Sequence, residues 1–248
     1  MYNFDAKKVK EELVKWLRDY FNNNGQPINA VVGCSGGKDS TVVLAALKEA
    51  IGSERIYAIL MPNGKQADID DSYKVCEYLG LTPYVCNIQD AYNGILNSIS
   101  AEFPIISEQT KTNLAPVLRM ATLKAISQSV NGRFTCNGNA SEAYIGWFTI
   151  DGDDRGSIKP LIDLTVTEVI KVGKELGLPE WMINKTPADG LCGKADEDKF
   201  GFSYEVLDKY IRTGEIENTD TKEKIDKMHN CNLFKLNPMP WFNYKSSQ

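Results

Sequence analysis

Residues 28–47, INAVVGCSGGKDSTVVLAAL, carry the strongest indication of the fold. Residues 28–32 are almost all apolar and predict a buried strand, and residues 40–47 predict a helix that is apolar nearly all round. A glycine-rich turn, residues 33–40, joins the two. A strand that runs through such a turn into a helix is typical of open parallel sheets, whose ligands bind beyond the carboxyl ends of the strands.

The same alternation of strand and helix continues on both sides of this stretch. Apolar residues at helical spacing predict a helix over residues 5–21. After residue 47 we expect strands over residues 56–61, 83–86 and 133–136, and helices over residues 68–78, 91–99 and 114–130. A capping box, Thr165-x-x-Glu168, opens one more helix that ends at Gly177.

This pattern predicts an α/β fold, a doubly wound parallel sheet with helices on both faces. We expect residues 1–248 to form a single domain, because no linker or internal repeat divides the chain. Past Asp189 we expect short helices and polar loops that decorate the sheet.

Composition excludes several classes of protein. The chain has 248 residues, of which 42% are hydrophobic, and 28 Lys+Arg against 33 Asp+Glu give a net charge of −5. This acidic balance argues against non-specific binding to nucleic acid. No apolar run approaches the roughly 20 residues of a membrane span, and the start lacks the pattern of a signal peptide. We therefore expect a soluble cytoplasmic protein.

The six cysteines are scattered, and no two of them form a C-x-x-C pair. His229 is the one histidine of the chain, so a zinc site built from near neighbours is not expected. We expect most of the cysteines to be small buried hydrophobes in a reducing compartment.

The turn at residues 33–40 has the chemistry of a phosphate site. Its small residues let backbone N–H groups point inward, and the helix that follows adds its positive end. Lys38 adds a cation, and Ser35 and Ser40 add hydroxyl donors. The turn is not a Walker A loop, because Val32 replaces the first glycine and Asp39 follows the lysine. An acid in a phosphate loop indicates a Mg²⁺ ion between the acid and the phosphates.

Residues 35–40, SGGKDS, resemble the S-G-G-x-D-S pyrophosphate loop of the N-type ATP pyrophosphatases. Later segments resemble the ammonia-dependent NAD synthetases within that superfamily. The matching segments are Asn137-Gly138-Asn139-Ala140-Ser141-Glu142, Gly146-Trp147-Phe148-Thr149, Gly152-Asp153, Ala188-Asp189-Gly190-Leu191, Asp196-Glu197 and Leu207-Asp208.

The resemblance implies an adenine nucleotide alpha hydrolase-like fold and an ATP-dependent carbon–nitrogen ligase. The enzyme would amidate deamido-NAD⁺ with ammonia through an acyl-adenylate, releasing AMP and pyrophosphate. ATP and Mg²⁺ are the implied cofactors, a homodimer is the implied assembly, and neither nucleic acid nor membrane is an expected partner.

The resemblance also implies roles for individual residues. Lys38 and Asp39 are the expected catalytic residues, and Asp39 and Glu142 are the expected Mg²⁺ ligands. The expected ATP-binding residues are Gly33, Ser35, Gly36, Gly37, Lys38, Asp39, Ser40, Met61, Arg119 and Asn137. The expected substrate-binding residues are Trp147, Phe148, Asp153, Asp189 and His229.

The residues alone leave simpler interpretations open. Glu142 is also consistent with a solvated carboxylate at a helix start, and Arg119 with a surface ion pair. Trp147 and Phe148 are consistent with core packing. The acidic segment around Asp196 either closes over the site or is a solvated loop.

The departures from the family pattern concentrate on the substrate side. They are Pro116, Ile150, Ser157, Val166 and Pro187, most of which replace a charged or hydrogen-bonding residue of the family. Three alternatives therefore stay open: the same chemistry on a different carboxylate, a tRNA-modifying thiolase of the same superfamily using Cys34 or Cys136, and a non-enzymatic ATP-binding regulator.

Overall fold

Four short parallel strands form the sheet of this computed structural model, in the spatial order β3-β2-β1-β4. The strands are β1 (Asn29–Gly33), β2 (Ile56–Leu60), β3 (Pro83–Val85) and β4 (Gly132–Phe134). In the middle of the sheet, Val32 of β1 is paired with Ala58 of β2, and Val31 with Phe134 of β4. The chain thus builds outward from β1 and then returns to its other side, which puts a topological switch point between β1 and β4.

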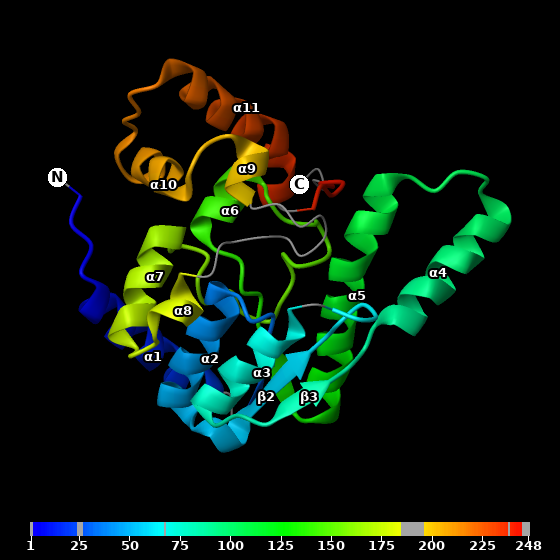
Figure 1. Ribbon diagram of the computed structural model, residues 1–248, viewed down its shortest axis with the longest axis horizontal. Coiled ribbons are helices and arrows are strands. Elements are labelled where there is room, and N and C mark those ends of the chain that lie inside the picture. Colours follow the sequence, from blue (N-terminus) through cyan, green and yellow to red (C-terminus); the bar gives the residue numbers. More distant parts are fainter. Residues whose placement is uncertain (1, 24–26, 67, 185–195, 238, 245–248) are drawn as a thin grey trace.

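Helices connect the strands and continue beyond them (Figure 1). The structure describes residues 2–23, 27–66, 68–184, 196–237 and 239–244. Within these ranges the helices are α1 (Ala6–Asn22), α2 (Lys38–Ile51), η1 (Ser53–Arg55), α3 (Ile69–Leu79), α4 (Gln89–Glu102), α5 (Glu108–Ser129), α6 (Ala140–Ile145), α7 (Val166–Glu175), α8 (Glu180–Ile183), α9 (Asp196–Phe200), α10 (Tyr204–Thr213) and α11 (Thr219–Leu236).

Helices pack on both faces of the sheet because side chains alternate along each strand. Ala30 and Val32 lie in one apolar cluster with residues of α1, α2 and α7. Val31, between them, lies in a second cluster with Leu123 of α5. The predicted doubly wound α/β fold is therefore confirmed.

A third apolar cluster joins the C-terminal helices to α6, through side chains that include Ile145, Leu207 and Ile225. Figure 1 shows α9, α10 and α11 grouped around α6 and away from the strands. Past Asp189 the sequence predicts mostly short helices, and α11, with 18 residues, is longer than expected. Among the described residues of α11, Ile225 alone is fully buried, so the sequence carries little helical hydrophobic periodicity there.

Helix α5 begins at Glu108 rather than at residue 114, and it contains Pro116. Ser107 caps its start by accepting a hydrogen bond from the Thr110 backbone N–H at 3.0 Å. A proline inside a helix removes one backbone hydrogen bond and usually marks a helix end. The helical residues 108–113 were therefore not predicted from the sequence.

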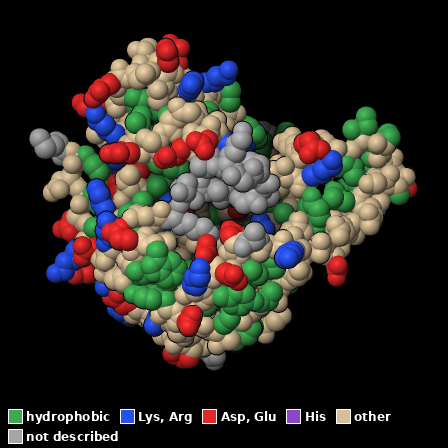
Figure 2. Space-filling view, in the orientation of Figure 1, with side chains coloured by type: hydrophobic (Ala, Val, Ile, Leu, Met, Phe, Trp, Pro, Cys, Tyr) green, Lys and Arg blue, Asp and Glu red, His purple; other side chains and the backbone are tan. Residues whose placement is uncertain are grey.

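Helix α4 and the start of α5, residues 89–115, project from the body of the protein as an arm. No residue of α4 is buried. Hydrophobic side chains nevertheless lie along the arm in the space-filling view (Figure 2). Among them, Phe103 is 62% exposed and Ile105 is 85% exposed. The arm therefore presents apolar surface beyond the core.

A buried carboxylate ties α7 to α10. Glu168 is 2% exposed and closes the predicted capping box with Thr165, whose backbone N–H donates to it at 2.8 Å. Arg212 of α10 donates from Nε to the same carboxylate at 2.8 Å, and the Tyr2 hydroxyl also donates to it. Burial raises the pKa of Glu168, but these hydrogen bonds outweigh burial and hold the pKa below its ordinary value.

We expect Arg212→Ala to lower the free energy of unfolding at pH 7 by about 3 kcal/mol, because it leaves a buried carboxylate short of its cation. Since the folded-state pKa of Glu168 is depressed, its contribution is present above the ordinary value of 4.5 and is lost as pH falls through the folded pKa. The difference between wild type and variant should therefore shrink in acid.

Urea unfolding at neutral and acidic pH measures this difference. The control is Arg155→Ala, which removes an exposed ion pair with Asp151 and should change stability by less than about 1 kcal/mol. A loss for Arg212→Ala no larger than that of the control would contradict the assignment.

Candidate functional site

The glycine-rich turn lies at the carboxyl end of β1 and opens α2. The Ser35 and Ser40 hydroxyls are 3.1 Å apart, and the Ser35 backbone N–H donates to Ser40 Oγ at 3.3 Å. Gly37 is the N-cap residue of α2 and has no side chain to satisfy the N–H groups that follow. The turn thus presents hydroxyls and a positive helix end together, which is an anion-binding arrangement.

Gly36 lets the turn lie directly against α3. Its φ of +73° is in the left-handed region, and an added Cβ would lie 2.9 Å from the backbone nitrogen of Ser72. Any larger residue would have to push the turn away from α3, so the shape of the turn depends on this glycine.

Two acidic side chains from different elements meet at the start of α2. Asp39 Oδ1 accepts a hydrogen bond from Asn139 Nδ2 at 3.2 Å. Asn139 is the N-cap of α6, and its Oδ1 accepts from the Glu142 backbone N–H at 3.0 Å. Glu142 completes that capping box from the third position of α6. The two expected metal ligands are therefore connected through one buried asparagine.

One buried cation, Lys38, lies beside this pair of carboxylates, and the charge of a further acid, Asp196, acts on it. Lys38 Nζ lies 2.8 Å from Asp39 Oδ2. Burial raises the pKa of Glu142 to about 8, and the Asp39 charge adds to the effect while Lys38 opposes it. Burial lowers the pKa of Lys38, but the charges of Asp39, Glu142 and Asp196 outweigh it and leave the pKa above its ordinary value.

The carboxylates of Asp39 and Glu142 suit a metal ion that takes few ligands from the protein and the rest from phosphate and water. Within the described part of the chain, no group of three or more His, Cys, Asp or Glu side chains that could hold a metal ion is present. Mg²⁺ usually takes one or two protein carboxylates and fills its shell with phosphate oxygens and water. The oxygens of Asp39 and Glu142 beside a phosphate turn match that chemistry.

Residues from the neighbouring strands close the site around the turn. Asn137, after β4, donates from Nδ2 to the Gly33 carbonyl at 3.3 Å across the switch point. Arg119 of α5 donates from Nε to the Met61 carbonyl at 3.1 Å, after β2. Burial lowers the pKa of Arg119, while the charges of Asp153 and Asp68 oppose the shift. Arg119 is thus held at the sheet edge, and no ion pair of it occurs among the residues described.

The expected substrate-binding residues lie around α6, and several of them make packing contacts. Trp147 packs edge-on against Phe200, with ring centroids 4.7 Å apart. His229 of α11 stacks on Tyr144 at 4.2 Å, and its Nδ1 lies 2.7 Å from the Tyr144 carbonyl oxygen. These contacts join the C-terminal helices to α6, and substrate contact by either residue stays a prediction.

The segment after Trp147 is held by α11 and by its own turn. Lys235 Nζ donates to the Phe148 carbonyl at 3.0 Å and lies 5.3 Å from the centroid of the Phe148 ring. Asp153 Oδ1 accepts from the Thr149 backbone N–H at 2.7 Å, and burial raises the Asp153 pKa. Asp189 and Pro187 lie outside the described residues.

The other departures have visible packing roles or lie at the surface. Val166 is buried in the C-terminal apolar cluster, and its backbone N–H donates to Ser141 Oγ at 2.9 Å. Ser157 donates its backbone N–H to the Phe134 carbonyl at 2.8 Å. Pro116 lies inside α5, with its Cβ close to Gly152, and Ile150 is exposed.

Sequence reasoning assigned no role to two residues near the carboxylates, Asn139 and Tyr204. Asn139 bridges the carboxylates, and the N-x-x-E capping pattern was the signal that could have found it. Asp196, for which a solvated loop stayed open, is buried at the start of α9, and Tyr204 of α10 donates its hydroxyl to Asp196 Oδ2 at 3.4 Å. No local pattern marks Tyr204, because the packing of α9 and α10 places it.

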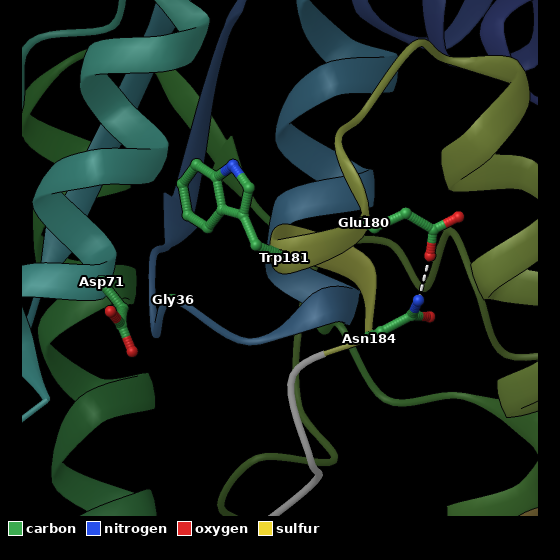
Figure 3. A pocket seen from close by; sticks show the side chains of 5 residues that line it. All are labelled: Gly36, Asp71, Glu180, Trp181 and Asn184. Carbon is green, nitrogen blue, oxygen red and sulfur yellow. Dashed lines mark hydrogen bonds between the residues drawn. The ribbon is translucent and has the colours of Figure 1, made fainter.

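A pocket of about 340 Å³ borders the glycine turn (Figure 3). It is lined by Gly36 of the turn, Asp71 of α3, Glu180 and Trp181 of α8, and Asn184. Asn184 Nδ2 donates to Glu180 on one side of it. The pocket gives solvent access to the face of the turn that lies between α3 and α8.

Comparison with known proteins matches nearly all of these elements. The family model of NAD synthase matches residues 9–239. The "NH(3)-dependent NAD(+) synthetase" of Finegoldia magna is 34% identical over 222 residues, which cover 89% of each chain. That of Carboxydothermus hydrogenoformans is 36% identical over 208 residues, 83% of this chain and 85% of the relative. A solved structure of NMN synthetase from Francisella tularensis has a TM-score of 0.88 and 30% identity, covering 98% of this chain and all of the other (100%).

We expect Gly36→Ala to weaken ATP binding at least about tenfold, because the left-handed conformation costs an L-residue 1–2 kcal/mol and the Cβ displaces the turn from α3. Calorimetric titration with ATP measures the change. The matched control is Gly80→Ala, since Gly80 also has positive φ (+62°) but has nothing within 4 Å of its Cβ position. ATP affinity equal in both variants would contradict this role for Gly36.

Proposed function

This chain belongs to the NAD synthase family, and we propose that it is an ATP-dependent ligase that amidates the nicotinate carboxylate of deamido-NAD⁺ with ammonia. Its curated relatives are NH₃-dependent NAD⁺ synthetases, and enzymes of this family use ATP. The observation that carries the proposal is the glycine turn at the end of β1, with Asp39 and Glu142 brought to it through Asn139.

The turn is the proposed site of the β- and γ-phosphates of ATP. The helix start after Gly37 and the hydroxyls of Ser35 and Ser40 supply hydrogen-bond donors, and Lys38 supplies positive charge. Asn137 and Arg119 hold the ends of the strands around the nucleotide. The contribution of these residues is to fix the nucleotide and to stabilise the pyrophosphate as it leaves.

In the proposed reaction, a carboxylate oxygen of the nicotinate group attacks the α-phosphorus of ATP. The bond from that phosphorus to the bridging oxygen breaks, and pyrophosphate leaves. Ammonia then attacks the acyl carbon and loses a proton to solvent, and AMP departs with the oxygen that came from the carboxylate. No nucleophile from the protein is required, so positioning and charge neutralisation account for the rate.

Asp39 and Glu142 are the residues proposed to hold Mg²⁺. Their oxygens fit the ion as a pair that leaves room for phosphate and water ligands. When bound, the ion supplies positive charge next to the leaving pyrophosphate. Asn139 donates to the Asp39 carboxylate and accepts from the Glu142 backbone N–H, so it fixes the position of Glu142 relative to Asp39.

A second acceptor is favoured by one specific comparison. The NMN synthetase structure of Francisella tularensis aligns over essentially the whole of both chains, with a TM-score of 0.88. The amide NMN corresponds to the acceptor nicotinate mononucleotide, which lacks the adenylate half of deamido-NAD⁺. Three residues on the expected substrate side differ from the family pattern, which supports a test of this smaller acceptor. They are Ile150, Ser157 and Val166.

Thiol chemistry argues against the sulfur-transfer alternative. Cys34 and Cys136 are both buried. A hydrogen bond with Cys76, followed by burial, raises the pKa of Cys34, and burial raises the pKa of Cys136. Sulfur transfer requires an accessible thiolate, which such surroundings oppose.

The arm is the surface that supports the proposed homodimer. Its exposed Phe103 and Ile105 would be covered by a second copy of the chain. We expect wild type to sediment as a dimer and the Phe103→Asp/Ile105→Asp variant to sediment as a monomer. A wild-type monomer would contradict the proposal.

None of the helices in the described ranges is long and apolar enough to cross a bilayer. We propose a cytoplasmic location.

Incubation with Mg-ATP, ammonium and each acceptor in turn tests the proposed function. We expect AMP and the amide to form in equal amounts, only when ATP and ammonium are both present. Asp39→Asn should lower the rate at least about a hundredfold, because it removes a charge from the proposed metal site. Chromatography of nucleotides measures both products.

The matched control is Asp70→Asn, which makes the same change on an exposed carboxylate of α3 and should keep wild-type activity. The ratio of kcat/KM for deamido-NAD⁺ and nicotinate mononucleotide decides between the two acceptors. ATP bound without any amide from either acceptor would favour the ATP-binding regulator instead.

A further inference from the structure

The Lys38 side chain is directed toward the Asp39 carboxylate rather than away from the glycine turn into solvent. It is 4% exposed, and its Nζ lies 2.8 Å from Asp39 Oδ2. A lysine at the start of a helix gains nothing from the helix dipole, which favours acids there. Its burial must therefore be explained by the groups that it faces.

Those groups come from four elements and are mostly acidic. Asp39 lies beside Lys38 on α2, Glu142 belongs to α6, and Asp196 begins α9. The nearest of these acids, Asp39, pairs directly with the Lys38 ammonium at 2.8 Å. The ring of Tyr204 from α10 lies 5.7 Å from Nζ and adds a further favourable contact.

The lysine thus provides the positive charge that Asp39 and Glu142 lack in the absence of a ligand. Among the described residues, Asp39 pairs with Lys38 and with no other cation, and no ion pair of Glu142 occurs. A divalent ion bound to Asp39 and Glu142 would lie close to the Lys38 ammonium. Two cations that are close together repel strongly in a buried site, where the effective dielectric constant is low. The ammonium and a free divalent ion therefore compete for the same acids.

We propose that Lys38 is a built-in counter-cation that keeps Asp39 and Glu142 from binding a divalent ion until phosphates arrive. The metal then enters with the nucleotide, whose negative charge accommodates both cations. This inference rests on the proposed function, because that function makes Asp39 and Glu142 the metal ligands. It differs from a role in which Lys38 only contacts phosphate, since removal of such a lysine would leave the affinity for free metal unchanged.

Titration of nucleotide-free protein with Mn²⁺, followed by the electron paramagnetic resonance signal of the free ion, tests the proposal. Wild type should bind Mn²⁺ weakly. Lys38→Met, which keeps the length of the side chain and removes its charge, should bind Mn²⁺ at least about tenfold more tightly. Lys38→Arg keeps the charge and should behave like wild type.

Two further variants locate the effect. Adding Asp39→Asn to Lys38→Met should abolish the gain, because the new metal site depends on that carboxylate. Lys48→Met makes the same change on an exposed lysine ten residues along α2, about 15 Å away, and should leave binding as in wild type.

Equal Mn²⁺ affinity in wild type and Lys38→Met would overturn the proposal. If circular dichroism finds Lys38→Met unfolded, wild type and Asp39→Asn still decide: tight wild-type binding that Asp39→Asn removes contradicts it, and weak binding in both supports it. Because neither nucleotide nor acceptor is present, a chain that makes no amide but gives the expected Mn²⁺ results would contradict only the proposed function.

Discussion

The Asn139 side chain is the point on which the two halves of the site depend. It donates to Asp39 at the start of α2 and caps α6, whose third residue is Glu142. The C-terminal helices in turn pack against α6, through contacts such as the stacking of His229 on Tyr144. This amide is fully buried, so it fixes the separation between the glycine turn on the sheet and Glu142 beyond it.

The sequence predicted the features whose signals are local. The apolar run of residues 28–32, the glycine turn and the helix after it are contiguous, and the capping box at Thr165 is a four-residue pattern. Tyr204 is placed only by the packing of α9 and α10, so no local pattern could assign it, and the same packing decides that Asp196 is buried rather than solvated. The orientation of Lys38 was missed for the same reason, because acids from distant segments determine it.

The substrate side differs from the phosphate side in what its residues do. At the glycine turn, the Ser35 and Ser40 hydroxyls and the Asp39 carboxylate lie together, and their contact with phosphate stays a prediction. On the other side, Val166 and Trp147 take part in apolar packing with the C-terminal helices. The structure therefore brings the groups of the glycine turn together, while the choice between the two proposed acceptors depends on surfaces that side-chain identity alone does not define.

In the proposed reaction, the acceptor carboxylate itself attacks ATP. An acceptor labelled with oxygen-18 in its nicotinate carboxylate tests this step, by mass spectrometry of the AMP released with ammonium present. We expect one labelled oxygen from each acceptor in the phosphate of AMP, since AMP leaves with the carboxylate oxygen. AMP without label, formed together with the amide, would contradict the acyl-adenylate and the function built on it.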